Sequence, residues 1–113
     1  MISVRHRFHG HGSLQAVYQR GHTVRGPLMN LRYAVRDPRR PYRVAVVVSR
    51  KVSKAAVTRN RIRRRLYESV RTSQVGVAAG TDLVFTVFDE HLAELPASEL
   101  QAAVDGLLRK TRA

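Results

Sequence analysis

Residues 44–66, VAVVVSRKVSKAAVTRNRIRRRL, join a run of five apolar residues to a basic segment with helical periodicity. The apolar run lies within residues 42–49, and it predicts a strand that is buried on both faces near the centre of a sheet. A helix is expected from Ser53, the candidate N-cap, to the region of residues 71–73. Its apolar stripe, at roughly 100° per residue, comprises Ala55, Thr58, Ile62, Leu66, Ser69 and Val70.

Three segments are expected upstream of this region. Residues 1–12 are polar and contain two glycines, which indicates an irregular basic arm. A short helix is expected over residues 14–20, where Ser13 is the candidate N-cap and Gly21 the C-terminal stop. Residues 29–35 alternate between apolar and polar side chains, and this period of two is typical of a strand with one apolar face.

Downstream of the basic helix, residues 75–80 are mostly small and are expected to form a loop. A turn at residues 80–82 precedes a predicted strand over residues 83–88. A last helix begins near Pro96 and continues to Lys110, with apolar residues at the spacing i, i+3, i+4, i+7, i+8.

The predicted order of elements is α-β-β(-β)-α-β-α, where the additional short strand lies near Leu28 or Val35. This order predicts an α+β fold in the form of a two-layer sandwich. A chain of 113 residues suits one hydrophobic core, so residues 1–113 are expected to form a single domain.

The composition excludes several classes of protein. The chain has no cysteine, which rules out disulfide frameworks and cysteine nucleophiles and suits a reducing compartment. Its longest apolar run is much shorter than the roughly 18 residues that a membrane span needs. Residues 1–20 contain no apolar signal segment, so we expect a cytoplasmic protein with no membrane partner.

The charge of the chain is large and uneven. There are 21 Lys and Arg residues against 8 Asp and Glu, a net charge of +13, and residues 1–81 alone carry +16. Like charges at this density repel one another unless a polyanion is near, so we expect an RNA-binding domain. A merely solvated basic face is a weaker alternative, given the size of the charge. Binding to an anionic membrane surface is also weaker, because the basic segment lacks the bulky apolar face of membrane-surface helices. Residues 50–65 contain no acid and eight basic residues: Arg50, Lys51, Lys54, Arg59, Arg61, Arg63, Arg64 and Arg65.

Two of these arginines, Arg59 and Arg63, lie one turn apart on the predicted helix. Their separation of about 6 Å along the axis is close to the phosphate spacing of a nucleic-acid strand. Asn60 lies between basic residues and offers both donors and acceptors. Its amide is expected either to hydrogen-bond a base edge or ribose, or to cap a neighbouring loop.

Residues 50–66 closely resemble the RNR signature of the bacterial ribonuclease P protein subunit. The strand at residues 46–49, the helix and glycine at 14–21 and the segment at 80–84 also match that family in order and spacing. The sequence departs from the family pattern in two ways. In the first helix the family usually has phenylalanine at two positions where this chain has Leu14 and Tyr18. Further along the chain the family favours glycine at the positions of Ala45 and Ser53.

The resemblance implies a fold similar to the ribosomal S5-type domain, with a left-handed βαβ crossover. It also implies that a large catalytic RNA removes the 5′ leader of precursor tRNA with Mg²⁺. The expected partners are therefore this RNA and precursor tRNA, with no protein partner and no catalytic residue in the polypeptide. The residues expected to bind the catalytic RNA are Arg50, Lys51, Lys54, Arg59, Asn60, Arg61, Arg63, Arg64 and Arg65. The expected leader-binding cleft comprises Leu14, Tyr18, Asn30 and Arg32.

Several alternatives remain open. The helical spacing of Tyr18 suits a core position equally well. A structural RNA-binding protein of ribosomal type would share the charge and size but would need no leader cleft. A protein nuclease with its own metal is disfavoured, because hard cations need clustered carboxylates and the basic region has only Asp37 and Glu68. Histidines 6, 9 and 11 have no carboxylate beside them, so we expect no metal site there.

Overall fold

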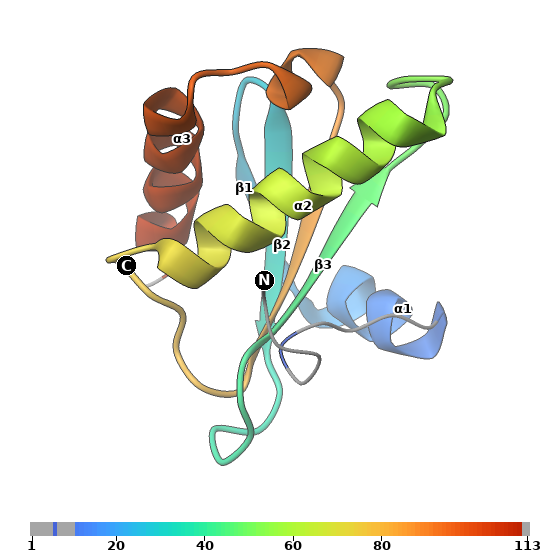
Figure 1. Cartoon of the computed structure of the whole chain (residues 1–113). Helices are drawn as coiled ribbons and strands as arrows, with labels where there is room; N and C mark the ends of the chain where they lie inside the picture. The colour runs from blue at the N-terminus through green and yellow to red at the C-terminus, as the bar shows by residue number, and fades with distance from the viewer. Residues whose placement is uncertain (1–5, 7–10, 112–113) are drawn as a thin grey trace.

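The computed structural model describes His6 and residues 11–111. Four strands form one mixed sheet, α2 and α3 cover one face of it, and α1 packs against the other (Figure 1). This arrangement confirms the predicted α+β class. The elements are α1 (His11–Arg20), β1 (His22–Arg25), β2 (Met29–Val35), β3 (Arg43–Val48), α2 (Ala56–Thr72), β4 (Thr81–Val87), the 3₁₀ helix η2 (Glu90–Ala93) and α3 (Ala97–Lys110).

The sheet has the strand order β1-β2-β4-β3. β2 is antiparallel to both of its neighbours, β1 and β4, whereas β3 and β4 are parallel. β4 therefore lies between β2 and β3, although it is the last strand in the chain. Phe85 in the middle of β4 has Leu31 of β2 on one side and Val46 of β3 on the other.

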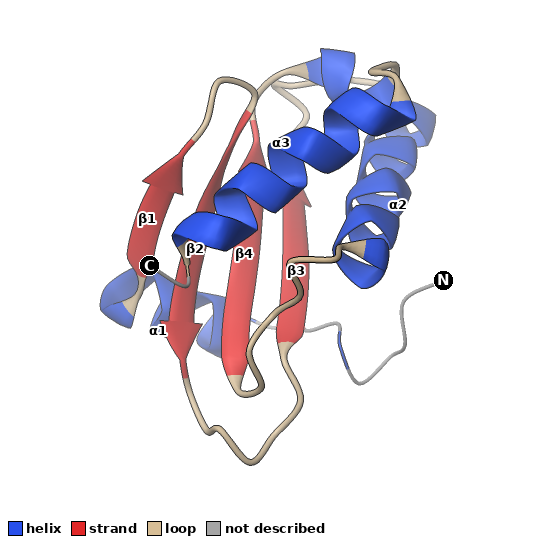
Figure 2. Cartoon of the chain, turned by 90° about the vertical axis from the view of Figure 1, so that its left-hand side faces the viewer, coloured by secondary structure: helices blue, strands red, loops and turns tan. Residues whose placement is uncertain are grey.

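The connection from β3 through α2 to β4 is a left-handed crossover. In Figure 1, β3 runs upward, α2 crosses in front of the sheet, and β4 lies to the left of β3. Figure 2 shows the same order from another side, with β4 to the left of β3. About 98% of such connections are right-handed, so this topology is rare. It agrees with the left-handed crossover that the resemblance implies.

The main core lies between the sheet and the helices α2 and α3. Leu31 and Phe85 of the sheet, Ile62 and Leu66 of α2, and Val104 of α3 are all completely buried there. Burial of each such side chain contributes about 1.5–3 kcal/mol to folding. No helix in the described part of the chain is long and apolar enough to cross a membrane. The buried residues of α2 match the predicted stripe at Ile62, Leu66, Ser69 and Val70.

α1 covers a smaller part of the opposite face. Val17 of α1 is buried against Ala45 of β3 and Val84 of β4. The helix ends before Gly21, whose N–H donates to the Val17 carbonyl oxygen at 2.7 Å. A Cβ on Gly21 would lie 2.7 Å from the Tyr33 carbonyl oxygen, so glycine permits the close approach of α1 to β2. The predicted helix stop is confirmed.

β3 is an edge strand, so the predicted central position is wrong. The valine run correctly indicates burial on both faces. Val44 and Val46 belong to the core under α2, while Ala45 packs against α1. Because helices cover both faces of this edge strand, its sequence resembles that of a central strand.

The additional strand is β1, at His22–Arg25, and does not lie near Leu28 or Val35. Its sequence, HTVR, is too polar to show an apolar alternation, and only its pairing with β2 makes it a strand. β4 includes Thr81 and Asp82, which the sequence assigns to a turn. Both side chains are buried, so the strand extends further into the core than its apolar residues indicate.

Two helix starts differ from the sequence prediction. α2 begins at Ala56 with Ala55 at the N-cap position, because Ser53 instead accepts a hydrogen bond from the Ala55 N–H at 3.3 Å in the preceding loop. α1 begins at His11, so Ser13 lies inside the helix and is not its N-cap. Most of the expected N-terminal arm, residues 1–5 and 7–10, lies outside the described residues.

Candidate nucleic-acid interface

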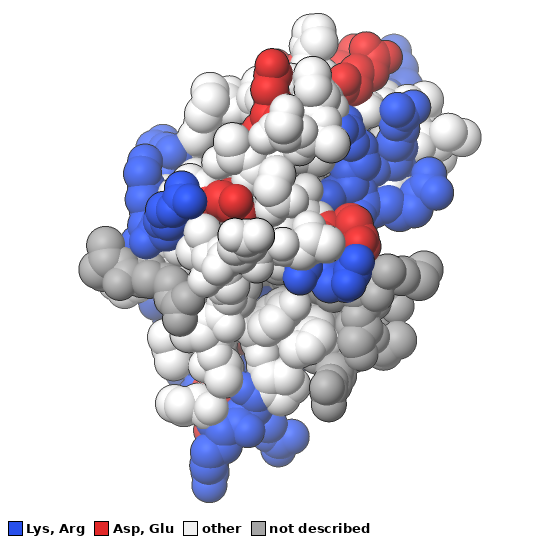
Figure 3. All heavy atoms as spheres, turned by 60° about the vertical axis from the view of Figure 1, so that its left-hand side comes forward, with Lys and Arg blue, Asp and Glu red and all other residues white. Residues whose placement is uncertain are grey.

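The basic residues in and before α2 form two groups that differ in what their side chains contact. Arg50, Lys51 and Lys54 are exposed in the connection between β3 and α2, and Arg61 and Arg64 are exposed on the helix. The side chains of these five make no hydrogen bond or ion pair with another described residue. In Figure 3 the Lys and Arg side chains form separate groups, with uncharged surface and some acidic side chains between them. The five outward cations are therefore available to a ligand.

Arg59 and Arg63, by contrast, fasten the start of α2 to the preceding strand and loop. Arg59 Nη1 donates to the Ser53 carbonyl oxygen at 2.9 Å and to that of Lys54 at 3.0 Å. Arg63 Nη2 donates to the carbonyl oxygen of Val48, the last residue of β3, at 3.4 Å. Both guanidinium groups are half-buried and bind the protein's own backbone, which their one-turn spacing in the sequence does not reveal.

Arg65 joins α2 to η2. Its Nη1 donates to the Leu92 carbonyl oxygen at 2.8 Å, and its Nη2 donates to the carbonyl oxygen of Leu95. Hydrogen bonds from a charged donor are stronger than neutral ones, so one guanidinium group holds the 3₁₀ turn against the helix. Arg65 therefore belongs with Arg59 and Arg63, and we call these three the carbonyl-binding arginines.

Asn60 and Glu68 each pair with an arginine of the same helix. Asn60 Oδ1 accepts a hydrogen bond from Arg63 Nη1 at 2.8 Å, so the amide caps no neighbouring loop among the described residues. Arg71 Nε donates to Glu68 Oε1 at 3.1 Å, and the hydrogen bonds from Arg71 lower the pKa of the Glu68 carboxyl to about 2. The single carboxylate of α2 is thus paired with Arg71 at the helix's C-terminal end and binds none of the outward cations.

Arg32 of β2 supports the C-terminal end of α1. Its Nε donates to the Val17 carbonyl oxygen at 3.1 Å, and its other nitrogens donate to the Tyr18 carbonyl oxygen and the Thr23 hydroxyl. The last carbonyls of a helix lack intrahelical partners and favour a nearby cation. Arg32 lies on the expected face of the sheet, where its guanidinium fixes the position of α1.

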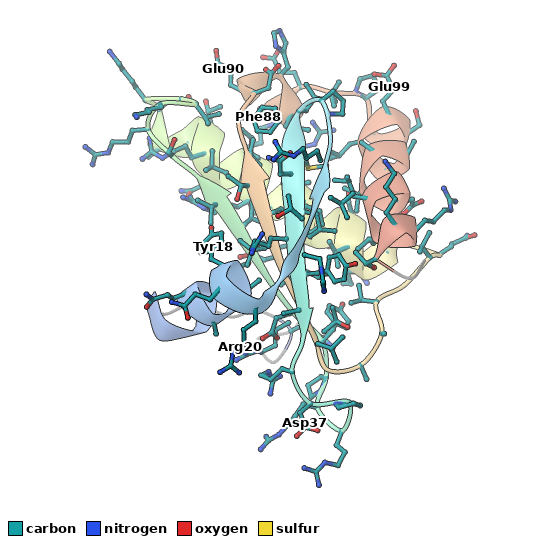
Figure 4. The ribbon with its side chains drawn as sticks, turned by 180° about the vertical axis from the view of Figure 1, so that it is seen from behind. Tyr18, Arg20, Asp37, Phe88, Glu90 and Glu99 are labelled. Atoms are coloured by element: carbon teal, nitrogen blue, oxygen red, sulfur yellow. The ribbon has the colours of Figure 1, made fainter. Side chains whose placement is uncertain are left out.

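Two exposed aromatic side chains lie on the sheet face that carries α1. Tyr18 projects from α1 and is 43% exposed, so the alternative of a core position is wrong. Phe88 is 49% exposed and follows β4 directly. Its N–H continues the ladder by donating to the Leu28 carbonyl oxygen at 3.2 Å, so the alternation along β4 places Phe88 on the same face as Val84. Figure 4 views the molecule from this side and labels both aromatics.

Phe88 is a candidate binding residue that the sequence analysis missed. The signal for it was the period of two that continues past β4 from Val84 through Thr86. Asn30 lies on the same face, half-buried, and its Oδ1 accepts a hydrogen bond from the Gly26 N–H at 3.4 Å. The side chain of Leu14 lies outside the described part of the chain.

The acidic side chains are dispersed over the molecule. Within the described residues, no group of three or more His, Cys, Asp or Glu side chains could hold a metal ion. The carboxylates therefore do not provide the clustered oxygen ligands that suit Mg²⁺. Four of them already have a basic partner: Asp82 is bound by Arg43, Asp37 by Arg39, Glu68 by Arg71 and Asp89 by His91.

Of the three N-terminal histidines, only His6 has a described side chain. Its ring stacks on Tyr42 with the ring centroids 4.0 Å apart, and its Nδ1 lies 2.9 Å from the Tyr42 carbonyl oxygen. The side chains of His9 and His11 lie outside the described residues, so the structure does not place the three rings together.

Sequence comparison identifies relatives along nearly the whole chain. A family model described as ribonuclease P matches residues 2–112. The ribonuclease P protein component of Chloroflexus aurantiacus is 40% identical over 94 residues, which cover 83% of this chain and 68% of that protein. The ribonuclease P protein component of a Synechococcus species is 34% identical over 113 residues, covering 97% of this chain and 84% of that protein.

Solved structures share the fold. The Staphylococcus aureus RNase P protein superposes with a TM-score of 0.79 at 19% identity, covering 95% of each chain. The Thermotoga maritima RNase P protein gives a TM-score of 0.74 at 19% identity, covering 86% of this chain and 89% of that one. The match to the family model and the identity to its curated members show that this chain belongs to the ribonuclease P protein family, the protein component of the ribonucleoprotein endoribonuclease that processes tRNA.

Proposed function

We propose that this chain binds the catalytic RNA of ribonuclease P through the five outward cations and holds the single-stranded 5′ leader of precursor tRNA against the sheet face that carries α1. The observation that carries the proposal is the group of exposed, unpaired cations around the start of α2. Arg61 and Arg64 lie on the helix, and Arg50, Lys51 and Lys54 lie just before it. An exposed guanidinium without a protein partner binds phosphate oxygens two at a time.

The leader surface is supported by the two exposed aromatics. Proteins bind single strands by stacking a few bases on aromatic rings while cations follow the backbone. Tyr18 and Phe88 supply two such rings. Phe88 therefore provides a second exposed aromatic in a chain that has Leu14 in place of the family's phenylalanine. Arg32 acts in this proposal as a positioning residue, since it holds the helix that carries Tyr18.

We further propose that the Mg²⁺ of the reaction is bound by the RNA and the substrate phosphates. The dispersed carboxylates support this assignment, because the ones nearest to cations are already paired with them. The chain then contributes binding and orientation of RNA, and none of its side chains attacks the scissile bond. A structural RNA-binding protein of ribosomal type would share the cations, but it would not respond to the leader.

The test is a cleavage assay with the catalytic RNA, with and without this chain, on precursors that carry long or very short leaders. We expect the chain alone to leave precursor intact in Mg²⁺ and to stimulate the RNA most on long leaders. Tyr18→Ala and Phe88→Ala should reduce that stimulation for long leaders, whereas Tyr18→Phe, which keeps the ring, should preserve it. Cleavage by the chain without RNA, or stimulation that ignores leader length, would overturn the proposal.

A further inference from the structure

A hollow of about 590 Å³ lies on the sheet face that carries α1, at the end of the sheet away from Phe88. Residues from α1, β1, β2, β3 and β4 line it, so it is a feature of the folded domain and not of one loop. The residues that matter for its chemistry are Arg20, His22, Arg36, Arg43 and Asp82.

The base of this hollow is a buried carboxylate that holds two guanidinium groups in place. Arg43 binds Asp82 with two hydrogen bonds, Nε to Oδ1 at 2.9 Å and Nη2 to Oδ2 at 2.8 Å. Arg36 Nε lies 3.4 Å from Asp82 Oδ2. The Asp82 side chain is 5% exposed, whereas those of Arg43 and Arg36 are 25% and 36% exposed. The Asp82 carboxylate is therefore buried beneath the two guanidinium groups, which are more exposed to solvent.

Arg20, in the last turn of α1, adds a third cation from the opposite wall. It is exposed and makes no hydrogen bond or ion pair with another described residue. Three arginines thus converge on a hollow that contains one acidic side chain, and positive charge exceeds negative charge among its lining residues. Such a site favours an anion with several oxygens, because guanidinium groups recognise planar pairs of oxygens.

α1 separates this hollow from the leader surface. Tyr18 and Arg20 are two residues apart, which is about 200° around a helix. Figure 4 shows them on opposite sides of α1, with Tyr18 toward the Phe88 end and Arg20 toward the Asp37 turn. A ligand in the hollow therefore contacts different residues from a base that stacks on Tyr18.

We propose that the hollow is a second RNA site, in which Arg20 and Arg36 bind a backbone phosphodiester and the Arg43–Asp82 pair forms its rigid base. The proposal rests on the proposed function only in that RNA is the ligand. The phosphodiester comes either from the catalytic RNA or from the part of the precursor leader beyond Tyr18. The chemistry is the same for both sources, and the experiment separates them.

The test variant is Arg20→Gln combined with Arg36→Gln, and the matched control is Arg39→Gln with Arg40→Gln. The control removes two exposed cations from the neighbouring turn, outside the hollow. Both variants retain Arg43 and Asp82, and circular dichroism verifies their folding; Arg20→Gln alone serves if the double variant unfolds. The affinity for catalytic RNA, and the affinity of the assembled ribonucleoprotein for precursors with long and short leaders, are measured against salt concentration.

For the test variant we expect the slope of log K against log[salt] to fall by about 0.7–0.9 per lost phosphate contact, with a smaller change in the control. A loss with catalytic RNA alone identifies that RNA as the source, and a loss confined to long leaders identifies the leader. An unchanged slope for every RNA, or an equal change in the control, overturns the proposal. The Arg61→Gln and Arg64→Gln variant tests the α2 surface in the same assay, so failure of the hollow is distinct from failure of the proposed function.

Discussion

The arginines of α2 that bind carbonyl groups differ from those that face outward, although all lie within one short segment of sequence. Arg59, Arg63 and Arg65 are half-buried and donate to the protein's own backbone. Arg61 and Arg64 are exposed and have no described partner. The number of arginines in this segment therefore exceeds the number that is free to contact RNA. The carbonyl-binding arginines hold α2 in place, and this helix presents Arg61 and Arg64 to solvent.

Helical position alone does not separate the two groups. Arg61 and Arg65 are one turn apart and share a side of α2, yet only Arg65 meets a neighbouring backbone. Leu92 of η2 and Leu95, which follows η2, offer their carbonyl oxygens to Arg65. The role of each arginine is thus decided by whether its guanidinium group meets free carbonyl oxygens, and for Arg65 these come from a distant part of the chain.

The strongest test of the comparison is stability. Arg65→Ala removes the donors to the Leu92 and Leu95 carbonyls. It should lower the free energy of unfolding by at least about 1.5–3 kcal/mol, the contribution of one hydrogen bond to a charged group. The matched change Arg64→Ala should stay within about 0.5 kcal/mol of the parent protein. Urea unfolding followed by circular dichroism measures both. Equal losses in the two variants would abolish the distinction between the groups.

RNA binding gives the converse test. Arg61→Gln with Arg64→Gln should reduce the slope of log K against log[salt] for the catalytic RNA by about 1.4–1.8, the value for two lost phosphate contacts. Arg59→Gln with Arg63→Gln removes the same charge, but it should change the slope less and the unfolding midpoint more. If the second pair carries the larger slope change, the guanidinium groups leave their carbonyls when RNA binds, and the comparison fails.

Local pattern predicts much of this fold. The stripe centred on Ile62 and Leu66, the alternation of residues 29–35 and the glycine stop at Gly21 each depend on neighbouring residues alone. The edge position of β3 cannot be predicted in this way, because β4 follows β3 in the sequence and lies between β2 and β3 in the sheet. A buried valine run is compatible with either position once helices cover both faces.

For the candidate site, too, the sequence predicts the segment involved but not the role of each residue. Sequence identifies the basic segment as a whole, but the separation of Arg61 from Arg65 depends on η2. The exposure of Phe88 on the α1 side of the sheet could not be predicted, because it depends on the register of β4 against β2, which the hydrogen bond from Phe88 to Leu28 extends. Arg32 is on the expected face, and only the structure shows that its donors are committed to α1.

The smallest expected effect concerns Arg71, which pairs with a carboxylate and so belongs to neither group. The pKa of Glu68 falls from 4.5 to about 2 because Arg71 donates hydrogen bonds to its ionised form. A lowered pKa in the folded state means that the pair stabilises the protein above about pH 4.5, and that this contribution is lost as pH falls toward 2. Both side chains are nearly half exposed, so screening by solvent keeps the effect below that of Arg65→Ala.

A double-mutant cycle with Glu68→Gln and Arg71→Gln isolates this pair from the rest of the helix. The coupling between the two positions, measured by urea unfolding, should be present at pH 6 and should vanish by about pH 2, where Glu68 becomes protonated. Added salt should weaken the coupling at pH 6, because exposed ion pairs are screened. The hydrogen bonds of Arg65 to carbonyl oxygens have no titrating acceptor, so the effect of Arg65→Ala should persist across the same range. A coupling that ignores pH would mean that Arg71 contributes by packing and not by its charge.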